Sequence, residues 1–200
     1  MIELISWIHP GLVICLGGLL IPFIPWKRLK QAYFLLLPLA GLAILVSTSS
    51  GIFGAIPSGP AALHKWNVPF LQYTLDIARI NKLSMLFGYV YVIAAFCMNI
   101  YALRVKNDWE HTVAMIYVGS ALGAVFAGDL FTLFFCLEIM SWAPFFLILF
   151  RGTRKAKGAA IRYILWHHVS GVCILAGILI HLHNTGSIAF VHMPWGWGGP

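Results

Sequence analysis

Long apolar blocks, separated by short polar segments, constrain the fold of this 200-residue chain more than any other feature. Each block approaches the roughly 20 residues that an α-helix needs to cross about 30 Å of hydrocarbon. The pattern predicts an all-α integral membrane protein with about six transmembrane helices. The predicted spans cover residues 5–26, 33–52, 83–103, 112–127, 129–150 and 159–182.

The composition and the connecting segments support this prediction. Hydrophobic residues make up 60% of the chain and charged residues 10%, whereas a soluble domain carries about 25% charged residues. We expect residues 1–182 to form one transmembrane domain and residues 183–200 to form a tail outside the membrane. The connection 53–82 is rich in Gly and Pro and contains a short alternating stretch, which indicates a hairpin on the outer surface. The opening residues have no basic region and no small-residue cleavage site, so we expect them to stay within the first helix.

The net charge of +7 follows the predicted membrane topology. Only Lys65, Arg79 and Lys82 fall on the side of the hairpin. Because basic residues gather on the cytoplasmic side of membrane proteins, we expect the N-terminus and the tail to lie outside. This placement does not favour nucleic acid as a partner. Ten basic residues flank the connections on the opposite side: Lys27, Arg28, Lys30, Arg104, Lys106, Arg151, Arg154, Lys155, Lys157 and Arg162.

One carboxylate lies near the middle of the fifth predicted span. Glu138 stands in the apolar run LFFCLEIMSWAPFF, where inserting an acidic side chain costs several kcal/mol. Such a residue indicates an ion pathway, and a carboxyl group can both take up and release protons. The alternative is a protonated, hydrogen-bonded side chain with a structural role. Ser141 shares the helical face of Glu138 and could hydrogen-bond its carboxyl group or a water.

The sixth predicted span supplies further polar candidates. His167 and His168 lie at nearly the depth of Glu138, and a histidine is a natural relay partner for a carboxylate. Consecutive residues point about 100° apart, so at most one of the two histidines can face the fifth span. The alternative is a buried histidine without a part in proton transfer. Arg162 can extend to the inner surface or point inward, and Asp129 either caps the fifth helix or marks the mouth of a pathway.

The remaining polar and sulfur residues do not indicate a metal or cofactor site. The four cysteines lie one per span without paired spacing, so neither a disulfide framework nor a zinc site is predicted. A b-type haem needs histidines at one depth on different helices, but the two central histidines lie on one predicted span. No cofactor, redox centre or catalytic residue is therefore assigned. Gly119, Gly123 and Ala127 form a stripe of small residues that favours close helix packing.

Three stretches together resemble a known family. The run AGDLFTLFFCLEIMSWAPFFLILF is followed by KGAAIRYILWHHVSGVCILAGILI, and LDIARINKLSMLFGYVYVI precedes both. They resemble the antiporter-like membrane subunits shared by respiratory complex I, Mrp-type sodium/proton antiporters and membrane-bound energy-converting hydrogenases. The resemblance covers about residues 60–182. It implies a prokaryotic cytoplasmic membrane as the location.

The resemblance also implies roles for single residues. Glu138 matches the proton-channel glutamate of the family, and Arg162 matches the basic residue at the start of the sixth helix. His168 falls where some members carry another polar or basic residue. Asn81 stands where members often carry an acid, which is a departure from the family pattern.

A second departure concerns length and predicts partners. Family members are usually much longer, and their glutamate works with lysines on later helices, whereas no lysine lies deep in the predicted spans. We therefore expect other membrane subunits, including a chain that supplies further helices and deep lysines. The implied function is a half-channel for protons or sodium in a redox-driven pump or a cation/proton antiporter. The alternative is a structural membrane subunit that conducts nothing.

Overall fold

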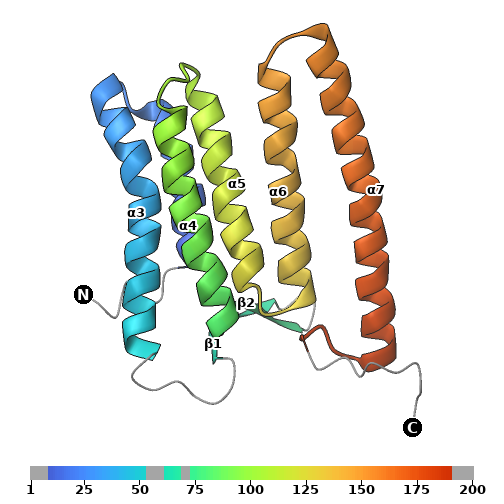
Figure 1. The fold of residues 1–200 in the computed structure, drawn as a ribbon. Coiled ribbons are helices and arrows are strands. Elements are labelled where there is room, and N and C mark those ends of the chain that lie inside the picture. The colour runs from blue at the N-terminus through green and yellow to red at the C-terminus, as the bar shows by residue number, and fades with distance from the viewer. Residues whose placement is uncertain (1–8, 53–60, 69–72, 191–200) are drawn as a thin grey trace.

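The computed structural model of the protein describes residues 9–52, 61–68 and 73–190. Within them the chain forms six α-helices, one short 3₁₀ helix and a two-stranded sheet (Figure 1). In chain order these are α2 (Pro10–Leu20), η1 (Ile21–Phe23), α3 (Lys27–Ile52), β1 (Ala61–Val68), β2 (Tyr73–Ile80), α4 (Lys82–Ala102), α5 (Asp108–Phe126), α6 (Leu130–Phe150) and α7 (Arg154–Thr185).

The helical fold and the membrane location predicted from the sequence are confirmed. Four helical segments are long and apolar enough to cross a membrane, and α2 with η1 forms a shorter apolar segment, Pro10–Phe23. Large apolar side chains are exposed on the outer helix surfaces, among them Leu165, Trp166 and Val172 on α7. A surface of this kind requires lipid or another apolar partner in place of water. The four spanning segments are Lys27–Ser47, Lys82–Ala102, Leu130–Phe150 and Arg154–Thr185.

Several helices extend beyond the spans predicted from the sequence. The predicted span 112–127 corresponds to α5, which begins at Asp108 because the Asn107 side chain accepts a hydrogen bond from the Trp109 backbone N–H. The predicted span 159–182 lies inside α7, which runs from the Thr153 cap to Gly186 in the left-handed conformation (φ 67°). Hydropathy marks the apolar part of a helix, whereas capping side chains determine where the backbone helix begins and ends.

The helix α5 lies at the centre of the bundle. It packs against α2, α4 and α6, and ten of its residues are buried. Small residues allow these close contacts: a Cβ atom on Gly119 would overlap Gly11 and Cys15 of α2, and one on Gly123 would lie against Cys136 of α6. The predicted stripe of small residues therefore packs against two different neighbours of α5.

The hairpin expected within residues 53–82 is present. Strands β1 and β2 pair antiparallel from Ala61↔Ile80 to Val68↔Tyr73, with an irregularity around His64. The hairpin is fixed to the helices at the start of α6. There the Asp76 backbone N–H donates to the Asp129 carboxylate (2.7 Å), and the Gly128 N–H donates to the Asp76 carbonyl (2.8 Å).

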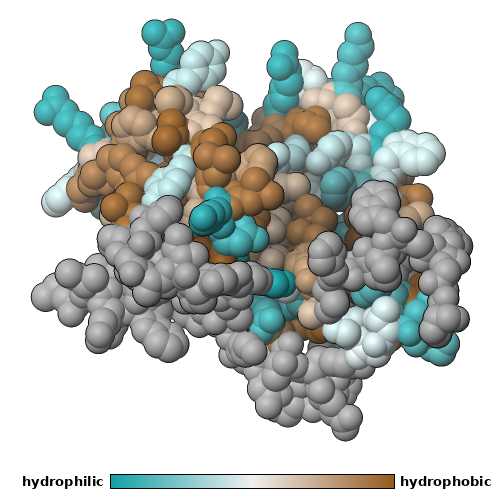
Figure 2. All heavy atoms as spheres, turned by 60° about the horizontal axis from the view of Figure 1, so that its bottom comes forward, coloured by the Kyte–Doolittle hydropathy of each residue, from teal (hydrophilic) through white to brown (hydrophobic). Residues whose placement is uncertain are grey.

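Basic residues gather at the end of the bundle opposite the hairpin. Figure 1 shows the start of α3, the α4–α5 connection and the α6–α7 connection at this end. Figure 2 shows apolar side chains along the helix flanks, with hydrophilic side chains beyond them at that end. Lys30 of α3 forms an ion pair with Asp108 of α5 there. The separation of charge follows the predicted pattern, and the orientation in the membrane remains a prediction. Of the predicted tail, residues 191–200 lie outside the described residues.

Candidate functional site

Glu138 lies near the middle of α6, with its side chain directed at α7. The side chain is 23% exposed and packs against Gly171, where an added Cβ atom would overlap the carboxylate oxygen Oε1. The glycine on α7 therefore provides the space that the carboxylate occupies. Gly171 is buried, and the atoms nearest to it across the seam are those of the Glu138 carboxyl group.

His168 is the ionisable partner of Glu138. Its Nδ1 lies 3.4 Å from the Glu138 Oε2, and its side chain is 42% exposed. This distance falls within ion-pair range but exceeds the usual N–H···O hydrogen-bond distance of about 2.9 Å. The Trp142 ring packs edge-on against the imidazole, with the ring centroids 5.4 Å apart. Helical spacing explains the cluster, since Trp142 lies one turn after Glu138 and Gly171 lies one turn after His168.

His167 lies on another face of α7. Its ring stacks on Tyr163, with centroids 5.7 Å apart. It lines a shallow surface depression together with Arg162, Trp166 and Ser170. The structure thus brings one of the two adjacent histidines to Glu138, as the angular spacing of helical residues requires.

Ser141 supports the backbone beside the carboxylate. Its hydroxyl donates a 2.7 Å hydrogen bond to the backbone carbonyl of Glu138, and its side chain is buried. The sequence suggested a hydrogen bond to the carboxyl group or to a water, and the structure records the bond to the carbonyl instead. A serine hydroxyl in a helix often returns to a carbonyl of the preceding turn, which satisfies it without a second polar side chain.

The two flanking candidates lie at opposite ends of the bundle. Arg162 is exposed, and its guanidinium reaches back to Gly158, one turn nearer the basic end of α7. Asp129 is buried and caps α6 through the Thr132 N–H (2.7 Å) and hydroxyl (2.8 Å). Its second oxygen also accepts from the backbone of β2, so the side chain joins the hairpin to the helix.

The sequence interpretation did not include Gly171 and Trp142 in the site. Their spacings from His168 and Glu138 were the available signals, because residues three or four apart share a helical face. It also left Asn81 without a role, whereas the structure shows Asn81 and Ser84 forming a capping box at the start of α4. An amide side chain at this position caps the N-terminus of α4, because its oxygen accepts a hydrogen bond from the Ser84 backbone N–H.

The Glu138–His168 pair lies at the lateral edge of the bundle. It is one of two side-chain ion pairs within the described residues, the other being Lys30–Asp108. Because α7 packs mainly against α6, the seam between these helices reaches the surface, and both members of the pair are partly exposed. A carboxylate and an imidazole in contact can hold a proton between them and pass it to a third group.

Comparison with a family model covers the segment that contains this pair. Residues 127–195 match the transmembrane family described as NADH:quinone oxidoreductase/Mrp antiporter. Over 90 residues the chain is also 30% identical to the uncharacterized protein MJ1309 of Methanocaldococcus jannaschii. The match covers 45% of this chain and 19% of that protein.

Two solved structures share the fold. A chain of the membrane-bound sulfane sulfur reductase, described as an archaeal respiratory membrane complex, superposes with a TM-score of 0.75 at 22% identity. The match covers 91% of this chain and 28% of that chain. A chain of the Mrp complex from Dietzia sp. DQ12-45-1b gives a TM-score of 0.65 at 20% identity, over 94% of this chain and 20% of that one. This chain thus spans less than a third of the length of each of these proteins.

Proposed function

We propose that this protein is a membrane subunit of a multisubunit ion-translocating complex, because residues 127–195 match the transmembrane family described as NADH:quinone oxidoreductase/Mrp antiporter. In this proposal Glu138 is a protonatable gate and His168 is its relay partner. The observation that carries the proposal is the 3.4 Å contact between Glu138 Oε2 and His168 Nδ1 within the hydrophobic part of the bundle. His167 remains a second relay candidate, reached by a change of rotamer or through water.

The proposed mechanism uses the response of a partly desolvated carboxyl group to nearby charge. A positive charge that approaches the α6–α7 seam favours the ionised carboxylate, so Glu138 releases its proton. When that charge withdraws, the neutral acid is favoured again and Glu138 takes up a proton. His168 accepts or supplies the proton, because an imidazole nitrogen can both bind and release a proton. A coupled complex would move the charge by switching between two conformations.

The moving charge is proposed to come from another chain. Every lysine in a described helix lies within its first four residues, at the polar end of that helix: Lys27, Lys30, Lys82, Lys155 and Lys157. The described helices therefore bring no lysine to the depth of Glu138. We assign the deep lysine and the further helices to a partner membrane subunit, in an Mrp-like antiporter or a redox-driven pump of a prokaryotic cytoplasmic membrane. Any electron transfer would take place on other subunits of that complex.

Glu138→Gln tests the proposal because it keeps the size and hydrogen-bonding capacity of the side chain but removes its proton exchange. We expect ion flux in proteoliposomes containing the whole complex to fall on the order of 100-fold, as for other lost proton-transfer groups. Glu110→Gln is the matched control. This residue lies in the first turn of α5 and accepts a hydrogen bond from Asn107, which the amide preserves. Its flux should remain at the wild-type level.

A structural subunit is the rival function. It predicts that Glu138→Gln leaves flux unchanged and at most weakens assembly of the complex. Co-purification of the partner chains measures assembly separately from flux. Normal flux in Glu138→Gln, with the subunit present at its normal ratio, would contradict the proposed gate.

A further inference from the structure

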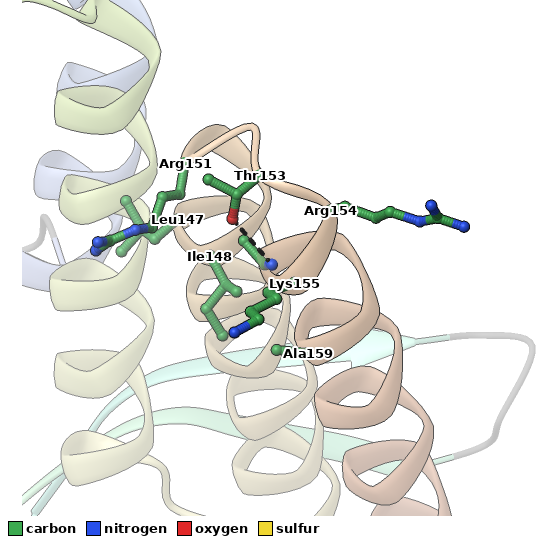
Figure 3. A pocket seen from close by; sticks show the side chains of 8 residues that line it. Leu147, Ile148, Arg151, Thr153, Arg154, Lys155 and Ala159 are labelled. Carbon is green, nitrogen blue, oxygen red and sulfur yellow. Dashed lines mark hydrogen bonds between the residues drawn. The ribbon is translucent and has the colours of Figure 1, made fainter.

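An open cavity lies where α6 ends and α7 begins, and the proposed ion pathway does not use it. Its volume is about 860 Å³, and it lies at the basic end of the bundle, away from Glu138. Figure 3 shows the side chains that surround it. They are Leu147, Ile148, Arg151, Thr153, Arg154, Lys155, Ala156 and Ala159.

Three basic side chains, those of Arg151, Arg154 and Lys155, line the cavity. In Figure 3 the Lys155 amine lies between Ile148 and Ala159, whereas Arg151 extends past Leu147 away from Lys155, and Arg154 extends away on the opposite side. No acidic residue follows Glu138 in the sequence. Within the described residues neither Arg151 nor Lys155 forms an ion pair. The cavity also lies at the N-terminus of the 32-residue helix α7, whose dipole adds positive potential there.

The helix walls of the cavity carry apolar side chains. Leu147 and Ile148 of α6 form one wall, and Ala156 and Ala159 of α7 form the other. The small alanine side chains leave a groove between the helix backbones (Figure 3). This groove lies within the last turn of α6 and the first two turns of α7, where a transmembrane helix pair passes from hydrocarbon to headgroups.

We propose that this cavity binds an anionic phospholipid. The phosphate would contact Lys155, and Arg151 would reach the same phosphate after a change of rotamer, while an acyl chain would lie in the groove between Ile148 and Ala159. A soluble anion would use the basic groups but gain nothing from the apolar walls, whereas a lipid uses both. Basic pockets between transmembrane helices on the cytoplasmic side are a recurrent way to bind anionic headgroups. The proposal is independent of the function proposed for Glu138.

Lipid titration of the purified full chain, together with the chains that accompany it, tests the headgroup site. Native mass spectrometry would compare the binding of phosphatidylglycerol and phosphatidylcholine. We expect Arg151→Gln/Lys155→Gln to weaken phosphatidylglycerol binding about tenfold or more, since each basic residue near an anionic surface contributes several-fold in affinity. Lys27→Gln/Arg28→Gln is the matched control, because it removes the same charge from the same end of the bundle at the start of α3. Equal losses in the two variants, or equal binding of both lipids, would overturn the proposal.

A second variant tests the groove and leaves every charge in place. Ala159→Phe fills the space between the helices and is expected to weaken phosphatidylglycerol binding by a similar factor. Ala176→Phe is the control, since Ala176 is exposed on α7 about five turns beyond Ala159. Because both variants keep the basic residues, they also keep the charge pattern that orients the protein. Wild-type lipid binding in Ala159→Phe would show that no acyl chain occupies the groove.

Discussion

At the scale of single residues, the site depends on which side of α7 each polar group occupies. His168 contacts Glu138, whereas the adjacent His167 stacks on Tyr163. The sequence presents the two histidines as equivalent in type and nearly equivalent in depth. The packing of α7 against α6 makes them different, since a rotation of about 100° separates consecutive side chains.

His168→Gln and His167→Gln therefore form a matched pair of variants. We expect His168→Gln to lower ion flux of the complex at least about tenfold, because a lost proton-transfer group removes a relay step. His167→Gln should retain most of the flux, because its ring has no contact with Glu138. Measuring flux against pH in proteoliposomes distinguishes a relay defect from a loss of assembled protein. A larger loss in His167→Gln would reverse the assignment.

At the scale of helices, a glycine on α7 determines where the Glu138 side chain can lie. Gly171 leaves room for the Glu138 carboxylate, whereas Gly177, also on α7, has open space where its Cβ would stand. A glycine in a helix interior costs about 1 kcal/mol relative to alanine. Gly171 carries the same cost, but its missing side chain is what leaves room for the Glu138 carboxylate between α6 and α7.

Gly171→Ala should separate function from stability. The added methyl group overlaps the far end of a flexible side chain, so Glu138 can move aside at little cost in folding free energy. The displaced carboxylate would lose its contact with His168, and we expect flux to fall severalfold at an unchanged thermal unfolding temperature in detergent. Gly177→Ala, the control, should change neither quantity by much. A large drop in stability for Gly171→Ala would instead indicate that the helix backbones themselves clash.

At the scale of the whole molecule, charge separates the two ends of the bundle. The connections at one end carry most of the basic residues, and the hairpin with Asp76 and Asp129 occupies the other. This asymmetry predicts that the hairpin end faces outward. With that orientation the proposed lipid cavity would lie in the inner leaflet, whose anionic lipids attract basic groups.

Accessibility of substituted cysteines in intact cells would test the orientation. In a variant without the four native cysteines, a membrane-impermeant maleimide should label Thr185→Cys at the hairpin end and leave Thr153→Cys unlabelled. Both side chains are exposed in the protein, at opposite ends of α7. Disrupted cells should label both positions equally. The opposite pattern in intact cells would place the basic end outside.

The sequence by itself determined the membrane class, the helical segments and the hairpin, and it singled out residues 127–150 as the run that resembles a known family. Hydropathy and charge patterns can be read from consecutive residues, so long apolar blocks and a lone carboxylate are recognised from the sequence alone. The family resemblance, which the sequence placed at about residues 60–182, is confirmed by the family match over residues 127–195, because it rests on local motifs.

Only the tertiary structure decided which groups meet. Three features depend on how the helices rotate and pack. They are the contact of Glu138 with His168, the space left by Gly171 and the hydrogen bond that Asp129 accepts from β2. The side of a helix that faces its neighbour follows from the packing of the whole bundle, because ridges and small residues on several helices must fit at once. The sequence of one helix limits which of its faces can be buried, and the neighbouring helices determine which of those faces is buried.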